Sequence, residues 1–434
     1  MQHRDDGHGG RTAAAIRNQH TKVVMSALLA NAMEFYDFVV YVFFAAYIGR
    51  AFFPPGDRFM SLIMALAVFG VGFVSRPFGA VVLGRYADRR GRRPAMLLTV
   101  GLITSATCVM ALMPTYRDIG ILATLVLTAC RLVQGFCFGG EFGPSIAFLA
   151  EVAPARRRGL YCAGLFAGQG VAVVAAGILG TVATWWLTPE QMQDWGWRVP
   201  FLLAAAAAPV SIFLRRQMPE SLLAIRGQGT TPEAGPKAGR VIALTLAILG
   251  GTVANYVCSY LPTYANVTLG MHEVASMSVS IVIGVVTCVF ALLGGWLADA
   301  YDRRRVLLSS RLACAVLAVP MFAWLSANPS PPALWLTAAV LAATNAINAG
   351  ALFDLMAESF APRYRATAIS IIYAMGVALF GGSTQFAVAW LGQVTASPLA
   401  PSWYLFVTSL VAFGALWPIQ KAATEGGRPT ALVR

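Results

Sequence analysis

The sequence is poor in charge. Charged residues make up 12% of its 434 residues, about half of the share that is typical of a soluble domain. By contrast, 58% of the residues are apolar, and the mean hydropathy is +0.66. This composition excludes a disordered protein, a fibrous protein and an ordinary soluble enzyme.

Long polar stretches are also scarce. A helix needs roughly 20 apolar residues to cross a bilayer, and runs of that kind recur along the whole chain. The polar residues 1–21 lead into a run that is too long for the apolar region of a cleavable signal peptide, so we expect an uncleaved anchor. The pattern predicts an all-α polytopic membrane protein. Its twelve transmembrane helices are expected near residues 22–49, 61–85, 95–113, 120–150, 160–187, 198–216, 240–266, 274–299, 306–326, 334–359, 366–394 and 402–420.

One longer polar stretch, Gln217 to Gly239, interrupts this pattern and is rich in Gly, Pro and Thr. It separates six predicted spans from six others. We therefore expect two six-helix bundles joined by a linker, with a short tail at each end. The predicted segments are 1–21 (tail), 22–216 (first bundle), 217–239 (linker), 240–420 (second bundle) and 421–434 (tail).

The net charge is +13, which in a soluble protein would suggest a nucleic-acid partner. In a membrane protein the placement of the charge matters more, because Lys and Arg concentrate on the cytoplasmic side. Of the 32 basic residues, 25 fall in the tails, the linker or the loops on that side, and three fall within spans. Only Arg50, Arg58, Arg117 and Arg198 fall on the other side. We therefore expect both termini in the cytoplasm, a location in the cell inner membrane, and no nucleic-acid partner.

The two halves repeat each other. Gly84 to Arg93 (GRYADRRGRR) follows the second span, and Gly295 to Arg304 (GWLADAYDRR) follows the eighth, at an offset of 211 residues. Leu149 to Gly159 (LAEVAPARRRG) and Met356 to Ala366 (MAESFAPRYRA) form a second pair at nearly the same offset. Such duplication predicts two pseudo-symmetric bundles with a central cavity between them.

Several chemical signatures are missing. No Lys stands in a phosphate-binding loop, and neither H-E-x-x-H nor G-x-S-x-G occurs, which argues against an ATP-driven pump and an intramembrane hydrolase. The seven cysteines form no C-x-x-C pair and fall in apolar runs, where they fit packing better than a metal or disulfide role. None of the four histidines is central in a span. We expect no enzyme activity, no metal and no cofactor, so carboxylates must carry any coupled proton.

A charged side chain inside a transmembrane span costs free energy, so each one is a candidate for a functional or structural role. Glu34 and Asp37 share one face of the first span, and Arg131 and Glu141 lie on one stripe of the fourth. Because Arg131 and Glu141 are about 15 Å apart along the helix, Arg131 needs a carboxylate from another helix, and Glu34 or Asp37 is the candidate. The group forms either a cavity site or a structural ion pair.

Other polar residues in spans are candidates of lesser weight. Arg76 lies deep enough to bind an anion or to order the packing beside Pro77, whereas Arg311 is close enough to the helix end to snorkel. Asp354 is expected near the cytoplasmic mouth. Asn345, Asn348 and a hydroxyl stripe on the seventh span could line a polar cavity or join helices; the stripe comprises Tyr256, Tyr260, Thr263 and Tyr264. Gly164 and Gly168 would permit the sliding contacts of the fifth span.

These motifs together resemble the major facilitator superfamily. The resemblance covers residues 22–420 and rests on the repeated G-x-x-x-D-R-x-G-R-R loop and on R-x-x-Q-G at Arg131, Gln134 and Gly135. Further strings are similar to its metabolite:proton symporter branch, namely NAMEFYDF (31–38), GFVSRPFGAVVLGRYADRRGRR (72–93), GGEFG (139–143), WGWRVPF (195–201), YLPTY (260–264) and ALFGG (378–382). The second loop departs from the pattern, with Ala300 and Asp302 in place of Arg89 and Gly91.

The resemblance implies a secondary transporter that works by alternating access, with the repeated loops closing the cytoplasmic gate. The gating residues would be Gly84, Asp88, Arg89, Gly91, Arg92, Arg93, Asp299 and Arg303. A proton would be the coupling ion, carried by Glu34, Asp37 or Glu141.

The predicted substrate is a small di- or tricarboxylate, citrate first, because a guanidinium binds a carboxylate through two hydrogen bonds. Arg131 is the predicted anion contact, and the supporting residues are Gln134, Asn31, Arg76, Tyr260 and Asn348. The open alternatives are 2-oxoglutarate, shikimate, a zwitterionic osmolyte such as proline or betaine, a proton-driven drug exporter and a channel. We expect a monomer.

Overall fold

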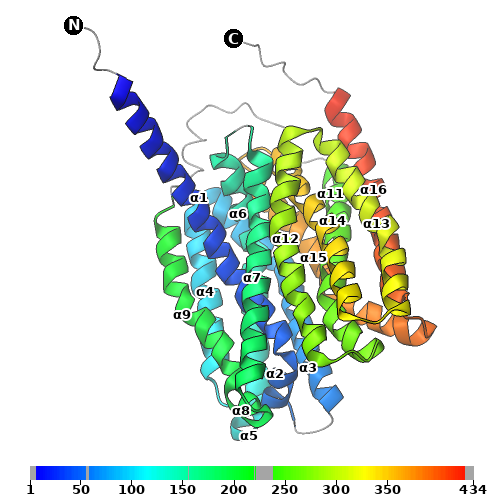
Figure 1. Cartoon of the computed structure of the whole chain (residues 1–434). Helices are drawn as coiled ribbons and strands as arrows, with labels where there is room; N and C mark the ends of the chain where they lie inside the picture. Colours follow the sequence, from blue (N-terminus) through cyan, green and yellow to red (C-terminus); the bar gives the residue numbers. More distant parts are fainter. Residues whose placement is uncertain (1–5, 55–57, 155, 219, 221–237, 426–434) are drawn as a thin grey trace.

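The computed structural model describes residues 6–54, 58–154, 156–218, 220 and 238–425. These residues are almost entirely helical (Figure 1). The helices are α1 (Asp6–Phe43), α2 (Ala45–Phe52), α3 (Arg58–Arg90), α4 (Arg92–Leu112), α5 (Tyr116–Ile119), α6 (Ile121–Val152), α7 (Arg158–Trp186), α8 (Pro189–Asp194), η1 (Gly196–Arg198), α9 (Val199–Arg216), α11 (Ala238–Thr263), η2 (Tyr264–Thr268), α12 (Glu273–Ala300), α13 (Arg303–Ala327), α14 (Pro331–Glu358), α15 (Arg365–Thr395) and α16 (Ala400–Glu425).

Within the described residues, twelve helices are long and apolar enough to cross a membrane, which confirms the predicted fold class. They are α1, α3, α4, α6, α7, α9, α11, α12, α13, α14, α15 and α16. The first helix differs most from the prediction, because it begins at Asp6 and ends at Phe43. Its early start follows the alanine-rich stretch RTAAAIR, which is a good helix former in water. The predicted linker lies mostly outside the described residues.

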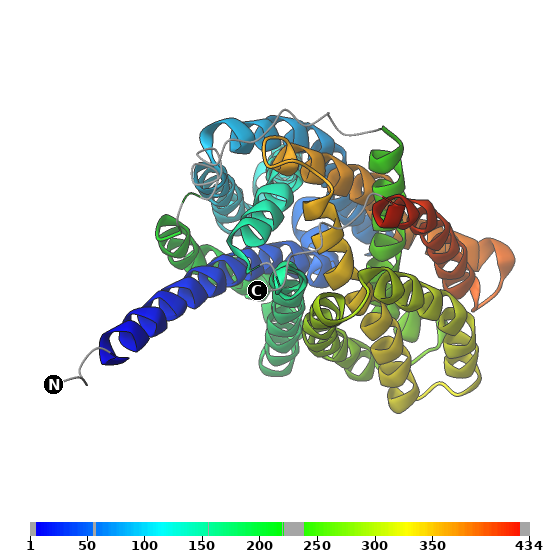
Figure 2. The same cartoon turned by 90° about the horizontal axis from the view of Figure 1, so that it is seen from above.

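The first six spans and the last six form two groups, one on each side of the molecule in both views (Figures 1 and 2). Helices α3 and α6 of the first group pack on α15 of the second, and α7 packs on α12 and α14. The first turn of α1 and the last turn of α16 project from the same end of the bundle (Figure 1). We call this end the terminal face, and the short helices α2, α5 and α8 lie at the opposite end.

Glycines allow the close contact between α7 and α12. A Cβ atom on Gly170 would lie 2.6 Å from the carbonyl oxygen of Gly284, and one on Gly159 would lie 2.6 Å from that of Gly295. Only glycine, which has no Cβ atom, allows the two helix backbones to approach each other this closely. The predicted pair Gly164 and Gly168 faces α1 instead, against Leu28 and Ala32, so it packs within the first group and not between the groups.

Candidate functional site

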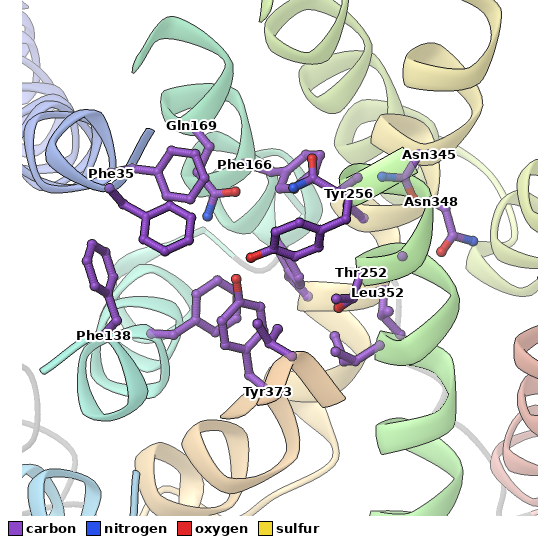
Figure 3. Close-up of a pocket in the computed structure, with 18 of the residues that line it drawn as sticks. Phe35, Phe138, Phe166, Gln169, Thr252, Tyr256, Asn345, Asn348, Leu352 and Tyr373 are labelled. Atoms are coloured by element: carbon purple, nitrogen blue, oxygen red, sulfur yellow. The ribbon is translucent and has the colours of Figure 1, made fainter. Parts of the chain in front are cut away.

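A cavity lies between the two groups of helices. Its volume is about 850 Å³, and part of this space is open to solvent. Gln169, Phe35 and Phe138 line it from the first group, and Tyr256, Thr252, Asn345 and Asn348 line it from the second (Figure 3). Of the predicted site residues, Asn31, Arg76, Glu141 and Asn348 also line it. The predicted central cavity is therefore present.

A buried ion triplet lies beside the cavity. The Arg215 Nη2 atom donates to Glu34 Oε2 and to Glu141 Oε1, each at 2.7 Å. All three side chains are almost fully buried. Arg215 lies in the last turn of α9, beside Arg216 at the end of the predicted sixth span. It counts with the basic residues of the cytoplasmic side, and sequence reasoning missed its role for that reason. Among the three, Glu141 lines the cavity.

Of the two predicted partners of Arg131, Glu34 and Asp37, Glu34 is therefore excluded, because it pairs with Arg215. The Arg131 Cζ atom lies 3.5 Å from the centre of the Tyr41 ring, and no ion pair among the described residues includes Arg131. Asp37 is its nearby opposite charge, but the Asp37 carboxylate instead accepts hydrogen bonds from Thr107 and Gln134, at 2.6 and 2.7 Å.

Arg131, Gln134 and Asp37 are buried and are absent from the residues that line the cavity. Arg131 and Gln134, which the sequence predicts as direct substrate contacts, therefore do not line the cavity. The stripe on α6 is long enough that its Arg131 end lies beyond the cavity, whereas its Glu141 end lines it.

Arg76 is held by aromatic rings. Its Cζ atom lies 4.1 Å from the centre of the Phe73 ring and 5.0 Å from that of Phe38, and its guanidinium is within hydrogen-bonding reach of the Tyr256 hydroxyl. No ion pair among the described residues includes it. The arginine thus combines a cation–π environment with a place on the cavity wall.

On the side of the second group, Arg311 lies in the cavity wall and is 1% exposed. It does not snorkel, because its Nη2 atom donates to Asn348 Oδ1 at 2.6 Å and to Asn345 Oδ1 at 3.5 Å. The expected contact Tyr260 is absent from the cavity wall, where Tyr256 stands instead. One helical turn separates the two, and Tyr260 packs against the hydrophobic cluster around Tyr264.

A stack of aromatic rings from both groups of helices lines the cavity. Phe142 stacks on Tyr373 with ring centres 3.4 Å apart, and it meets the Phe353 ring edge to face at 5.0 Å. These residues come from α6, α15 and α14, so the stack joins the two groups of helices. It lies one to three helical turns from the charged residues at the ends of the same helices.

Those charged residues form a second contact between the groups. Asp88, at the end of α3, accepts hydrogen bonds from the backbone amide of Thr367 at 2.9 Å and from its hydroxyl. Arg92 is fully buried; it pairs with Asp88 and Glu151 and donates to the Pro362 carbonyl oxygen at 2.9 Å. The first turn of α15 is therefore fixed to the first group.

The other predicted residues of this loop differ in their positions. Gly84 lies against Thr367, where a Cβ atom would come 3.0 Å from the Thr367 Cα atom. Gly91 has a φ of 117°, which only glycine adopts readily, and the next two backbone amides donate to Glu220. The Arg89 side chain is exposed and that of Arg93 is partly buried.

The second repeat makes the equivalent contact in the opposite direction. Asp299, at the end of α12, accepts hydrogen bonds from the backbone amides of Gly159 and Leu160 at 2.7 and 2.8 Å. Arg303 pairs with Asp354 at 2.6 Å and also with Glu358. The change from glycine to Asp302 leaves this contact intact, because Asp302 caps α13 by accepting from the Arg304 amide.

Residues 27–384 match the family described as Major Facilitator Superfamily. The chain belongs to this superfamily. Its structure agrees, since a solved proton:xylose symporter of the superfamily superposes with a TM-score of 0.77 at 18% identity, over 93% of this chain and 96% of that one. Members of the superfamily are transporters, so this chain is a multi-pass membrane transport protein.

Curated relatives cover nearly the whole chain. A citrate-proton symporter of Salmonella typhi is 32% identical over 411 residues, which are 93% of this chain and 95% of that protein. An alpha-ketoglutarate permease of Escherichia coli K12 is also 32% identical, over 90% of this chain and 91% of that protein. A putative proline/betaine transporter of Staphylococcus aureus is 31% identical, over 90% and 86%.

Proposed function

We propose that the chain is a proton-coupled symporter that imports a small organic carboxylate, citrate first, by alternating access. The observation that carries the proposal is that the cavity between the two groups of helices is lined by Arg76, an arginine without an ion-pair partner among the described residues, and by the carboxylate Glu141. The names of two relatives, citrate-proton symporter and alpha-ketoglutarate permease, support the same class of substrate.

Charge balance provides the coupling. Arg215 neutralises one of its two carboxylate partners, so the triplet with Glu34 and Glu141 carries one negative charge. An anionic substrate next to Glu141 is repelled until that carboxylate takes a proton. Proton binding and substrate binding therefore favour each other, and the coupling is reciprocal.

The orientation follows from the basic residues. The loops on the terminal face carry most of the arginines, which favours the cytoplasmic side for this face. The contacts of Asp88 and Asp299 then act as the cytoplasmic gate, and they hold the groups together in this structure. Opening toward the cytoplasm requires that both contacts break.

An osmolyte is the competing substrate, given the relative named as a putative proline/betaine transporter. Quaternary ammonium groups are commonly bound in cages of aromatic rings. Here the rings of Phe38, Phe73 and Phe138 surround the guanidinium of Arg76. The cation site that such a cage would offer is therefore already occupied, which favours an anionic substrate.

The test is uptake into proteoliposomes under an imposed proton gradient, with labelled citrate, 2-oxoglutarate, shikimate and proline offered separately. We expect accumulation of citrate or 2-oxoglutarate, abolished when the gradient is collapsed by a protonophore. Accumulation of proline alone, or of no acid in the panel, would overturn the proposal. Drug resistance of an expressing strain, without uptake of any acid, would favour an exporter.

A further inference from the structure

Arg311 is a buried cation that the proposed coupling does not use. Its side chain is 1% exposed, and its Nε and Nη1 atoms find no hydrogen-bond partner among the described residues. The partners of its Nη2 atom are the neutral side chains of Asn348 and Asn345. A buried guanidinium with unsatisfied donors and no carboxylate is costly unless a partner arrives.

The position of Arg311 shows where that partner would bind. It lines the same cavity as Arg76, but it comes from α13 of the second group, whereas Arg76 comes from α3 of the first. Arg76 also has an Nε atom without a hydrogen-bond partner and belongs to no ion pair of the described chain. The cavity therefore has one unpaired arginine on each side.

We infer that the substrate carries two carboxylates, one bound by Arg76 and the other by Arg311, so that it bridges the two groups of helices. This inference rests on the proposed function and narrows it to a substrate class. A guanidinium presents parallel N–H donors that match a carboxylate, and a second site in the other group adds a second such match. A monocarboxylate or a zwitterion would leave one arginine unpaired.

The charges around the cavity agree with a doubly charged anion. In and beside the cavity, three buried carboxylates (Glu34, Asp37 and Glu141) accompany four buried guanidiniums (Arg76, Arg131, Arg215 and Arg311). Three negative and four positive charges leave one positive charge. A dianion and one proton bring the loaded site to neutrality, which lowers the cost of moving it through a low-dielectric environment. A tricarboxylate would enter as its doubly charged form or bring a second proton.

Asn348 has a positioning role in this arrangement. It accepts from Arg311, and its own amide group donates to the Leu307 carbonyl oxygen at 2.9 Å and to the Ser310 hydroxyl at 3.1 Å. These contacts fix the Asn348 side chain, which in turn fixes the guanidinium without neutralising it. An aspartate in the same place would be a permanent ion-pair partner and would compete with the substrate.

The experiment compares a diacid with its half ester. The probes are the acid that the wild-type protein takes up best among citrate, 2-oxoglutarate and succinate, and its half ester, here the same acid with methyl esters on all of its carboxylates but one. Half-saturating concentrations are measured in proteoliposomes for wild type, Arg311→Gln, Arg76→Gln and Asn348→Asp. Arg305→Gln is the matched control, because Arg305 lies on the same helix and is exposed.

In wild type we expect the half ester to bind about 10- to 100-fold more weakly than the diacid, as the loss of a charge-assisted contact requires. In Arg311→Gln and Asn348→Asp, the ratio between the half-saturating concentrations of half ester and diacid should fall to less than about threefold for at least one ester. Arg305→Gln should retain the wild-type ratio. A merely structural role would weaken acid and ester equally.

The outcomes separate the two proposals. If the wild-type protein takes up none of the three acids, the proposed function fails. If it takes up an acid but Arg311→Gln keeps the full preference for the diacid over every half ester, the proposed function stands and the bridging site is wrong. Asn348→Asp guards against misfolding, since it preserves a partner for Arg311 and the size of the side chain.

Discussion

The Asp88 carboxylate accepts a hydrogen bond at 2.9 Å from the backbone amide of Thr367, although 279 residues separate the two in the chain. The bond joins the end of α3 to the first turn of α15, where backbone amides are unsatisfied and a negative charge is favourable. Asp299 makes the same kind of bond to the first turn of α7. Each half thus supplies an aspartate that holds a helix end of the other half.

Asp88→Asn should slow transport while changing the substrate affinity little. The amide loses the ion pair with Arg92 and weakens the bond to Thr367, so the closed terminal face is less stable, and the cavity is not touched. The check is the maximal uptake rate together with equilibrium binding of the substrate. Asp302→Asn is the control, because Asp302 is exposed and caps only its own helix. Normal turnover with a large loss of affinity would contradict the gating role.

Glu141→Gln should abolish uphill accumulation and spare exchange of substrate down its own gradient. The amide cannot release a proton, and Arg215 keeps its other partner, Glu34, so the site remains folded and permanently resembles its protonated form. The measurement is uptake under a proton gradient beside counterflow without one. Glu190→Gln, in an exposed position of α8, should leave both unchanged. Concentrative uptake by Glu141→Gln would assign the proton to another carboxylate.

Arg131→Gln and Arg76→Gln should differ in their effect on substrate affinity. Arg76 lines the cavity, so we expect its loss to raise the half-saturating concentration about tenfold or more. Arg131 packs on Tyr41 behind the cavity, so its loss should lower thermal stability and change the affinity less than about threefold. A tenfold affinity loss in Arg131→Gln at unchanged stability would restore it as the anion contact.

Gly170→Ala should destabilise the contact between α7 and α12. The added methyl group would lie 2.6 Å from the Gly284 carbonyl oxygen and 2.7 Å from the Cys288 backbone nitrogen, and such overpacking costs about 1–3 kcal/mol. Gly180→Ala, on the same helix with open space at that point, is the control and should be neutral or stabilising. Equal unfolding temperatures of the two variants in detergent would contradict the prediction, because they would show that α7 and α12 can move apart without loss of stability.

Hydropathy located the spans well because burial in lipid depends on local composition, and the repeats at an offset of 211 residues located the two aspartates that join the halves. Charge at the end of a helix was harder to interpret. Arg215 and Arg216 are neighbours in the sequence, yet Arg215 is 1% exposed and holds Glu34 and Glu141, whereas Arg216 is exposed. Composition cannot distinguish them, since only the rotation of α9 against α1 and α6 points one inward.

The sequence by itself determined the twelve helices, the duplication and the superfamily, because these depend on runs and repeats that are read along one chain. The tertiary structure decided which charges meet. It paired Glu34 with Arg215 instead of Arg131, put Tyr256 in the cavity wall in place of Tyr260, and left Arg311 buried beside two neutral amides. The reason is geometric: neighbouring positions on a helix point about 100° apart, so the face that each residue presents is set by how the helices pack.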